Sequence, residues 1–334
     1  MLLPIVIDAT TIDNGPSEAA RLEREDLLGR LIEYGITYFR EGEMGKTFVR
    51  LRSLPTSEKK RWQEGLKSSH PQPLNAAGIL PSDLKPIFGQ ADALVVLATA
   101  SADLTMAQIG FEPPVAVAPR TKTEYTAASH VRQSTSIQRR EEWAKEDIRS
   151  GTNLDLDQIA RQRFAPLFRS CRRLSIVDRY AFPTFCSDGE ASGLSWLLGQ
   201  LAANSQRSCK VSLYSVHSAK DEGRGLSGDL DIWVDAIKAR CTGLNGELNL
   251  YLGPEYLYKK TAHDRYLRID GYRVIDIGNG CDAFTGGSVS QRCSFHYRVL
   301  KRSDQRVAYR DMEDQLQGDT NVPVVTRVLG SGFE

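Results

Sequence analysis

Three features of the sequence predict an α/β protein with two domains. The chain has 334 residues, 41% of them hydrophobic, which is enough for two ordinary cores. Short apolar runs typical of buried strands alternate with segments of helical periodicity. All six cysteines lie after residue 170, so the composition changes between the two halves. We therefore expect two α/β domains, and in the second a largely parallel sheet covered by helices on both faces.

The first domain is expected over residues 1–112. Leu3 to Ile7 is wholly apolar, as in a buried strand, and Asp8 follows it directly. The further expected elements are a helix at 19–34 that Gly35 ends, a strand at 36–39, helices at 44–54 and 57–66, and an apolar run at 91–100 that fits either a strand or a buried helix.

Residues 113–150 are expected to form a linker and a bridging helix. The stretch 113–135 is polar and contains prolines, and a helix with interleaved charges follows at 138–148. The second domain is then 151–334. Its expected elements are helix 155–168, strand 174–177, helix 193–203, strand 210–216, helix 229–241 and strand 248–252.

The next segment contains the largest group of candidate catalytic residues, because His263, Arg265 and Asp270 have the spacing H-x-R-x4-D. On an extended strand, His263 and Arg265 share one face and are about 6.5 Å apart. A guanidinium grips two phosphate oxygens, while an imidazole attacks phosphorus or moves a proton. A solvent-facing strand without chemistry has the same alternation. Asp270-Gly271, between two apolar runs, predicts a hairpin turn.

This segment resembles the phospholipase D superfamily, whose signature is His-x-Lys-x4-Asp followed by Gly-Ser-x-Asn. It is most similar to the single-copy phospholipase-D-like domain found C-terminal to MIT domains, because Ile277 to Phe284 follows an Ile-Gly-x-Gly-x-Asp-x-Phe pattern. The resemblance covers residues from about 164 to 297 and implies a mixed sheet flanked by helices. Arg265 stands where the superfamily has lysine, and Asn279 and Cys281 match the later element only loosely.

The resemblance also implies roles for these residues. His263 is the nucleophile or general acid, Arg265 clamps the phosphate, and Asp270 orients the site, while Asn279 and Asp282 bind substrate. No cofactor is implied here. Superfamily catalysis uses two copies of the motif, so a single copy implies a homodimer in which the two His263 residues meet.

Two residues after the expected strand 174–177 are further candidates. Asp178 would orient the site and Arg179 would make a second phosphate contact; a helix cap and a surface arginine are the alternatives. His217 and His296 are candidates for a second imidazole, with a structural role as the alternative. The amides of Gly278 and Gly280 are expected to form an anion nest or merely to turn the chain.

The N-terminal region is similar to PIN-like nucleases, in which the first strand ends in an acidic residue and a later aspartate precedes an apolar segment. Here these residues are Asp8 and Asp92. The similarity implies that they hold Mg²⁺ or Mn²⁺ together with Glu41 or Glu43. An acidic residue after a first strand is also a common surface feature of α/β folds.

Composition limits the remaining function classes. The net charge of +1 gives no global basic field, so an anion site must be local. No apolar run approaches about 20 residues, and the start lacks an export signal, so we expect a cytoplasmic chain with reduced thiols. The cysteines form no C-x-x-C pair, which argues against zinc.

Three hypotheses follow. The first is a metal-independent phosphodiesterase, most plausibly a nuclease, with a role in defence against foreign DNA. The second is a catalytically inactive module that binds nucleic acid, phosphorylated partners or anionic lipid. The third is a metal-dependent PIN-like nuclease in the N-terminal domain.

Overall fold

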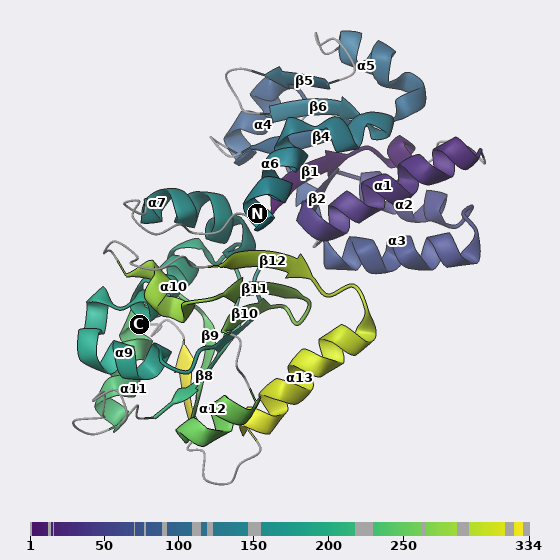
Figure 1. Ribbon diagram of the computed structural model, residues 1–334. Helices are drawn as coiled ribbons and strands as arrows, with labels where there is room; N and C mark the ends of the chain where they lie inside the picture. The colour runs from purple at the N-terminus through teal and green to yellow at the C-terminus, as the bar shows by residue number, and fades with distance from the viewer. Residues whose placement is uncertain are drawn as a thin grey trace. The chain divides into compact units, whose positions relative to one another are not determined.

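The computed structural model describes residues 2–12, 15, 17–69, 71–76, 78–88, 92–108, 115–118, 123–145, 155–217, 230–261, 265–285, 294–317 and 324–329. The chain divides into two compact units, Met1–Trp143 and Ala144–Glu334, and each is built on its own sheet (Figure 1). The expected α/β class is confirmed. Among the described helices, none has the length and apolarity needed to cross a membrane.

The N-terminal unit contains a six-stranded sheet in the order β3-β2-β1-β4-β6-β5. Its strands are β1 (Leu3–Ile7), β2 (Gly35–Arg40), β3 (Gln72–Leu74), β4 (Ala93–Leu97), β5 (Val115–Ala118) and β6 (Thr123–Ala127). Neighbouring strands are parallel, except that β5 runs antiparallel to β6. Because β4 pairs on both sides and is fully buried, residues 93–97 of the apolar run form a strand rather than a helix.

Helices cover both faces of this sheet. They are α1 (Glu18–Tyr34), α2 (Glu43–Leu51), α3 (Thr56–Ser68), α4 (Pro81–Phe88), α5 (Ala102–Gln108) and α6 (Thr135–Lys145). On one face, Phe88 of α4 and Met106 of α5 pack into a core with Val95. α1 begins at Ser17, whose hydroxyl accepts the Ala20 amide, and ends at Gly35. These ends agree closely with the expected helix at 19–34.

The expected linker begins too early. Residues 115–118 and 123–127 form β5 and β6, and Tyr125 of β6 lies in the core of the N-terminal unit. The boundary between the two units therefore falls after Trp143 rather than near residue 112. The prolines and polar residues of this stretch are also typical of a linker, so the sequence pattern alone does not distinguish the two.

The C-terminal unit contains a seven-stranded mixed sheet in the order β12-β11-β10-β7-β8-β9-β13. Its strands are β7 (Arg173–Val177), β8 (Cys209–Val216), β9 (Gly246–Gly253), β10 (Tyr266–Ile269), β11 (Arg273–Ile277), β12 (Phe295–Val299) and β13 (Val324–Leu329). β7, β8 and β9 are parallel to one another, and the other pairings are antiparallel. The hairpin expected at Asp270-Gly271 is confirmed, and both residues have positive φ.

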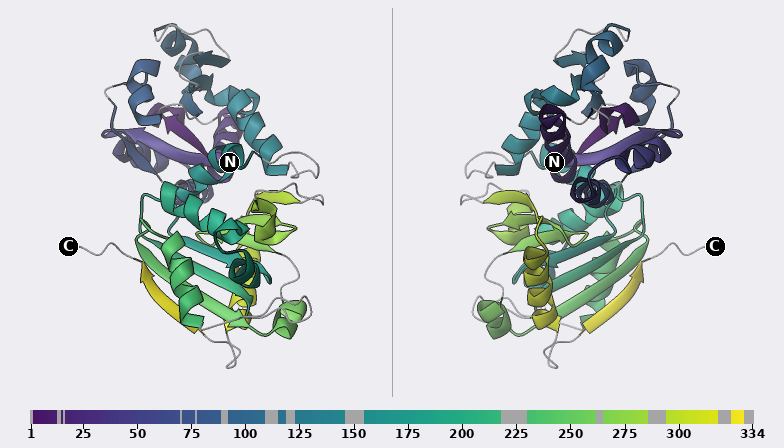
Figure 2. Two further views of the ribbon diagram at one scale, coloured as in Figure 1. Left: turned by 90° about the vertical axis from the view of Figure 1, so that its left-hand side faces the viewer. Right: turned by 90° about the vertical axis from the view of Figure 1, so that its right-hand side faces the viewer.

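Helices also lie on both faces of this second sheet (Figure 2). They are α7 (Leu156–Ile159), α8 (Ala165–Phe168), α9 (Ala181–Asp188), α10 (Gly193–Asn204), α11 (Leu230–Arg240), α12 (Glu255–Thr261) and α13 (Ser303–Gln317), with a π-helical turn at Ala160–Phe164 between α7 and α8. Tyr258 of α12 and Leu316 of α13 share a core with Tyr214 and Val274. α11 lies on the opposite face from α13 (Figures 1 and 2).

Candidate functional site

The sheet topology brings most of the motif residues to one edge of the C-terminal unit. β7, β8 and β11 end at this edge, which we call the carboxyl edge, and β10 begins there because it runs antiparallel to β7 and β11. Asp178 and Arg179 follow β7, Arg265 precedes β10, and the turn that contains Asn279 and Asp282 follows β11. Ligand sites of open α/β sheets form at such strand ends. His263 lies outside the described residues.

Asp178 is the buried centre of the carboxyl edge, with an exposed fraction of 2%. Its Oδ2 accepts the Cys281 amide at 2.6 Å, and its Oδ1 accepts the Tyr180 amide at 3.0 Å. The Arg265 Nε lies 3.8 Å from Oδ1. Burial of a carboxylate is tolerated where hydrogen bonds and a cation compensate the loss of water. Asp178 thus ties the end of β7, the start of β10 and the turn after β11 together.

Arg265 is a partly accessible cation of this edge, with 26% of its side chain exposed, against 21% for Arg179. Its guanidinium carbon lies 5.1 Å from the centre of the Tyr180 ring, and that of Arg179 lies 4.7 Å from the same ring. Arg179 also forms an ion pair with Glu255 at the start of α12. The Tyr180 ring therefore contacts both guanidinium groups, which helps to orient them.

The turn after β11 approaches Asp178 closely through glycine. Gly280 has a φ of +67°, and a Cβ there would lie 2.2 Å from Asp178 Oδ2 and 2.8 Å from Arg265 Cδ. The following short helix (Gly280–Phe284) is anchored by Phe284, whose ring stacks on Trp196 of α10 at 4.9 Å. Only a glycine leaves room for the Asp178 carboxylate and the aliphatic part of the Arg265 side chain at this point.

The expected anion nest at Gly278 and Gly280 is wrong in part. The Gly278 amide donates to the Ser294 carbonyl at 3.0 Å, so it is not available to a ligand. The neighbouring Cys281 amide is taken by Asp178. Cys281 itself is fully buried, and burial raises the pKa of its thiol well above 9.0, as do the nearby Asp178 and Asp282. That thiol remains protonated and is not a nucleophile.

Asp270 does not join the other motif residues. It lies at the far end of β10, one strand length from Arg265, or about 16 Å at the usual rise per residue. Its Oδ1 accepts the backbone amides of Arg172 and Arg173, at 2.9 and 3.1 Å. The carboxylate that holds Arg265 is Asp178 instead. Asp270 fixes the hairpin against β7 and has no role in orienting Arg265.

Asp8 and Asp92 cannot share one metal ion. β1 and β4 are parallel, and Asp8 follows the end of β1 whereas Asp92 precedes the start of β4, so the two lie at opposite edges of the sheet. Asp8 pairs with Arg40 at 2.6 Å, and Asp92 with Arg140 at 3.2 Å. Burial alone would raise the pKa of Asp8, but hydrogen bonds from Thr10 and the charge of Arg40 outweigh it, so this pKa lies below 3.8.

The other acidic candidates do not complete a metal site within the described ranges. Glu43 lies near Asp8 and accepts the Ala9 amide at 3.2 Å, but Lys46 pairs with it at 2.8 Å. Glu41 is exposed at the end of β2. No group of three His, Cys, Asp or Glu side chains that could hold an ion occurs in the described part of either unit.

The two remaining histidine candidates lie in different places. His217 is exposed directly after β8, so it is also at the carboxyl edge, next to the end of β7 in the sheet order. His296 is exposed on β12, opposite Asp276 of β11 and two strands from β10. His217 is therefore the better placed of the two for a role beside Asp178.

A second concentration of polar side chains was not anticipated from the sequence. It lies between the opposite end of the sheet and α13, a helix that the sequence patterns did not predict. The alternation of residues along the strands could have indicated this cluster. In runs otherwise typical of buried strands, polar residues occur two positions apart and so share a face: Arg173 and Ser175, and Lys210 and Ser212.

Comparison with known proteins adds no assignment. No protein-family model matches the chain, and no curated protein matches it. Any functional conclusion therefore depends on the residues and the geometry described above.

Proposed function

We propose that the C-terminal unit binds a phosphodiester at the carboxyl edge and cleaves it without a metal ion, with His263 as the nucleophile. One observation supports this most: a buried carboxylate, Asp178, holds a partly exposed guanidinium, Arg265, two positions from a histidine in the sequence. Arg265 is then oriented to bind phosphoryl oxygens in two places. Nucleic acid is the proposed substrate.

The proposed chemistry balances with water as co-substrate. The His263 imidazole attacks phosphorus, the bond to the leaving oxygen breaks, and a second imidazole protonates that oxygen. Water then hydrolyses the phosphohistidine and returns the enzyme to its starting state. The single motif requires the second imidazole to come from elsewhere, and we propose that a symmetric homodimer supplies the partner's copy.

Cleavage in the presence of EDTA tests this proposal. Full-length protein should degrade a labelled oligonucleotide with excess EDTA, and His263→Ala should abolish the activity. Arg265→Ala should reduce kcat/KM by about 10² or more, as expected for the loss of a charged group at a reacting phosphate. Asp282→Asn, a substitution in the turn after β11, should reduce the activity less than Arg265→Ala does.

Three outcomes separate the hypotheses. EDTA-sensitive cleavage that persists in His263→Ala would point to a different, metal-dependent centre. Binding without turnover would leave an inactive module that recognises phosphorylated ligands. Light scattering after size exclusion supplies the last criterion, because an active but strictly monomeric protein would rule out the contribution of a second chain.

A further inference from the structure

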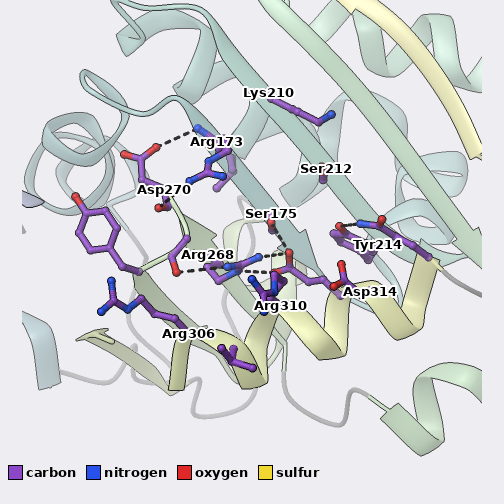
Figure 3. Close-up of a pocket in the computed structure, with 16 residues that line it drawn as sticks. Arg173, Ser175, Lys210, Ser212, Tyr214, Arg268, Asp270, Arg306, Arg310 and Asp314 are labelled. Atoms are coloured by element: carbon purple, nitrogen blue, oxygen red, sulfur yellow. Dashed lines mark hydrogen bonds and ion pairs between the residues drawn. The ribbon is translucent and has the colours of Figure 1, made fainter. Parts of the chain in front are cut away.

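A basic groove lies between α13 and the face of the C-terminal sheet, away from the carboxyl edge. Its cavity volume is about 440 Å³. Arg173 and Lys210, near the starts of β7 and β8, line the wall formed by the sheet, and Arg306 and Arg310 line the wall formed by the helix (Figure 3). All four side chains are exposed. Arg306 and Arg310 are four residues apart, so they project from the same side of α13.

Most carboxylates of the groove already accept hydrogen bonds from other groups of the protein. Glu313 accepts from Arg268 and from the Ser175 hydroxyl, at 2.7 and 3.0 Å, and Asp270 accepts two backbone amides of the neighbouring strand. Asp314 is the remaining acid in the lining. Lys210 pairs with Glu247 at 3.3 Å, and Arg310 lies 3.9 Å from Asp311. Among the described residues, no carboxylate lies within ion-pair distance of Arg173 or Arg306. Among the described residues that line the groove, five side chains are cationic and three are acidic, and Glu247 and Asp311 offset part of this positive excess from outside the lining.

Hydroxyl groups complete the floor. Ser175, Ser212 and Tyr214 occupy alternate positions of β7 and β8 and face the groove (Figure 3). The Ser175 hydroxyl already donates to Glu313, and the hydroxyl of the buried Tyr214 accepts from Gln317, so these two hydroxyls hold α13 on the sheet rather than contact a ligand. Because the whole chain has a net charge of only +1, the positive potential of the groove is local.

We infer that this groove binds the sugar-phosphate backbone of a single-stranded nucleic acid. Cations divided between two walls suit the successive phosphates of a polyanion better than one small dianion, which needs donors that converge. The volume lies in the range of small-ligand pockets, roughly 300–1,000 Å³, which favours one strand over a duplex. The inference concerns binding alone and does not require cleavage at the carboxyl edge.

The salt dependence of binding to fluorescein-labelled oligo-dT tests the inference. Anisotropy is measured in EDTA over a range of KCl concentrations with full-length protein. Arg306→Gln/Arg310→Gln should weaken binding and make the slope of log K against log[KCl] shallower by about 1.4, or 0.7 for each lost phosphate contact. Arg306→Lys/Arg310→Lys should keep the slope, because it keeps both charges.

The matched control is Lys238→Gln/Arg240→Gln. It removes the same two charges from the last turn of α11, on the opposite face of the sheet. Its slope should equal that of the unchanged protein. An unchanged slope in the Arg306/Arg310 glutamine variant, or an equal loss in the control, would overturn the inference. Equal affinity for a duplex, with the same dependence on Arg306 and Arg310, would overturn the choice of a single strand.

Failure of this inference is distinguishable from failure of the proposed function. His263→Ala should retain the full slope and affinity, because this change removes none of the cations that line the groove. If the groove variants lose binding and no protein cleaves, the groove assignment stands and the phosphodiesterase assignment fails. If cleavage depends on His263 but the groove variants bind as tightly as the unchanged protein, the phosphodiesterase assignment stands and the groove assignment fails.

Discussion

The arrangement at the carboxyl edge depends on the backbone conformation of one residue, Gly280. Its positive φ directs the turn after β11 back toward β7, and the following amide, that of Cys281, then reaches Asp178. The absence of a Cβ leaves the space that Asp178 and Arg265 occupy. A single methyl group at this position would thus disturb both the backbone and the ion pair.

Gly280→Ala should therefore destabilise the protein more than an alanine at another glycine with positive φ. A Cβ added at Gly243, where φ is +89°, would meet nothing within 4 Å beyond its own chain neighbours, so Gly243→Ala should cost only the backbone strain, about 1–2 kcal/mol. Gly280→Ala should cost about 1–3 kcal/mol more, because Asp178 must give up a buried hydrogen bond. Urea denaturation of both variants measures the difference, and equal losses would contradict the proposed crowding.

Among the elements of the C-terminal unit, α13 is held on the sheet by a buried ion pair. Arg268 of β10 and Glu313 of α13 have side chains that are 12% and 5% exposed. Burial lowers the pKa of Arg268, but the hydrogen bonds and charge of Glu313 outweigh it and raise the pKa above its ordinary value. This pair fixes the position of the helix that forms one wall of the basic groove.

Removal of one partner should be costly. Glu313→Ala should lower the free energy of unfolding by about 3–5 kcal/mol, because it leaves the Arg268 charge buried without a counterion. Replacing both residues, as Arg268→Met/Glu313→Leu, should recover most of that loss.

The control is the exposed pair of Arg302 and Asp304, with side chains 74% and 60% exposed. Asp304→Ala should change the stability by less than about 1 kcal/mol. Chemical denaturation provides all three values. A Glu313→Ala loss no larger than that of Asp304→Ala would show that the buried pair does not hold α13.

For the chain as a whole, the decisive feature is the division into two units after Trp143. β6 pairs with β4 along its whole length, from Ala93 with Thr123 to Leu97 with Ala127. A boundary at residue 112 would leave that side of β4 unpaired and remove Tyr125 from the core. Unpaired edges of buried, apolar strands promote aggregation.

Fragments of the chain distinguish the two boundaries. Residues 1–145, which keep α6 whole, should fold with a cooperative urea transition and native-like circular dichroism. Residues 1–112 should be unfolded or aggregated, because they lack β5 and β6. If the shorter fragment unfolds as cooperatively as the longer one, the added strands are not part of the folding unit.

Local sequence patterns were enough to predict the α/β class, most helices and strands, and the hairpin at Asp270-Gly271. These features follow from periodicity and turn chemistry, which act over a few residues. Asp178 and Arg179 were candidates because they follow an apolar run. Arg265 and the turn after β11 were candidates because of the motif spacing and the family resemblance.

Which of these residues meet depends on the tertiary structure. The length of β10 separates Asp270 from Arg265, and the parallel direction of β1 and β4 places Asp8 and Asp92 at opposite edges of their sheet. The segment expected to be a linker forms strands because β6 pairs with β4. The basic groove exists because α13 packs against the sheet. Contacts between distant segments depend on strand order and direction, which the local pattern does not encode.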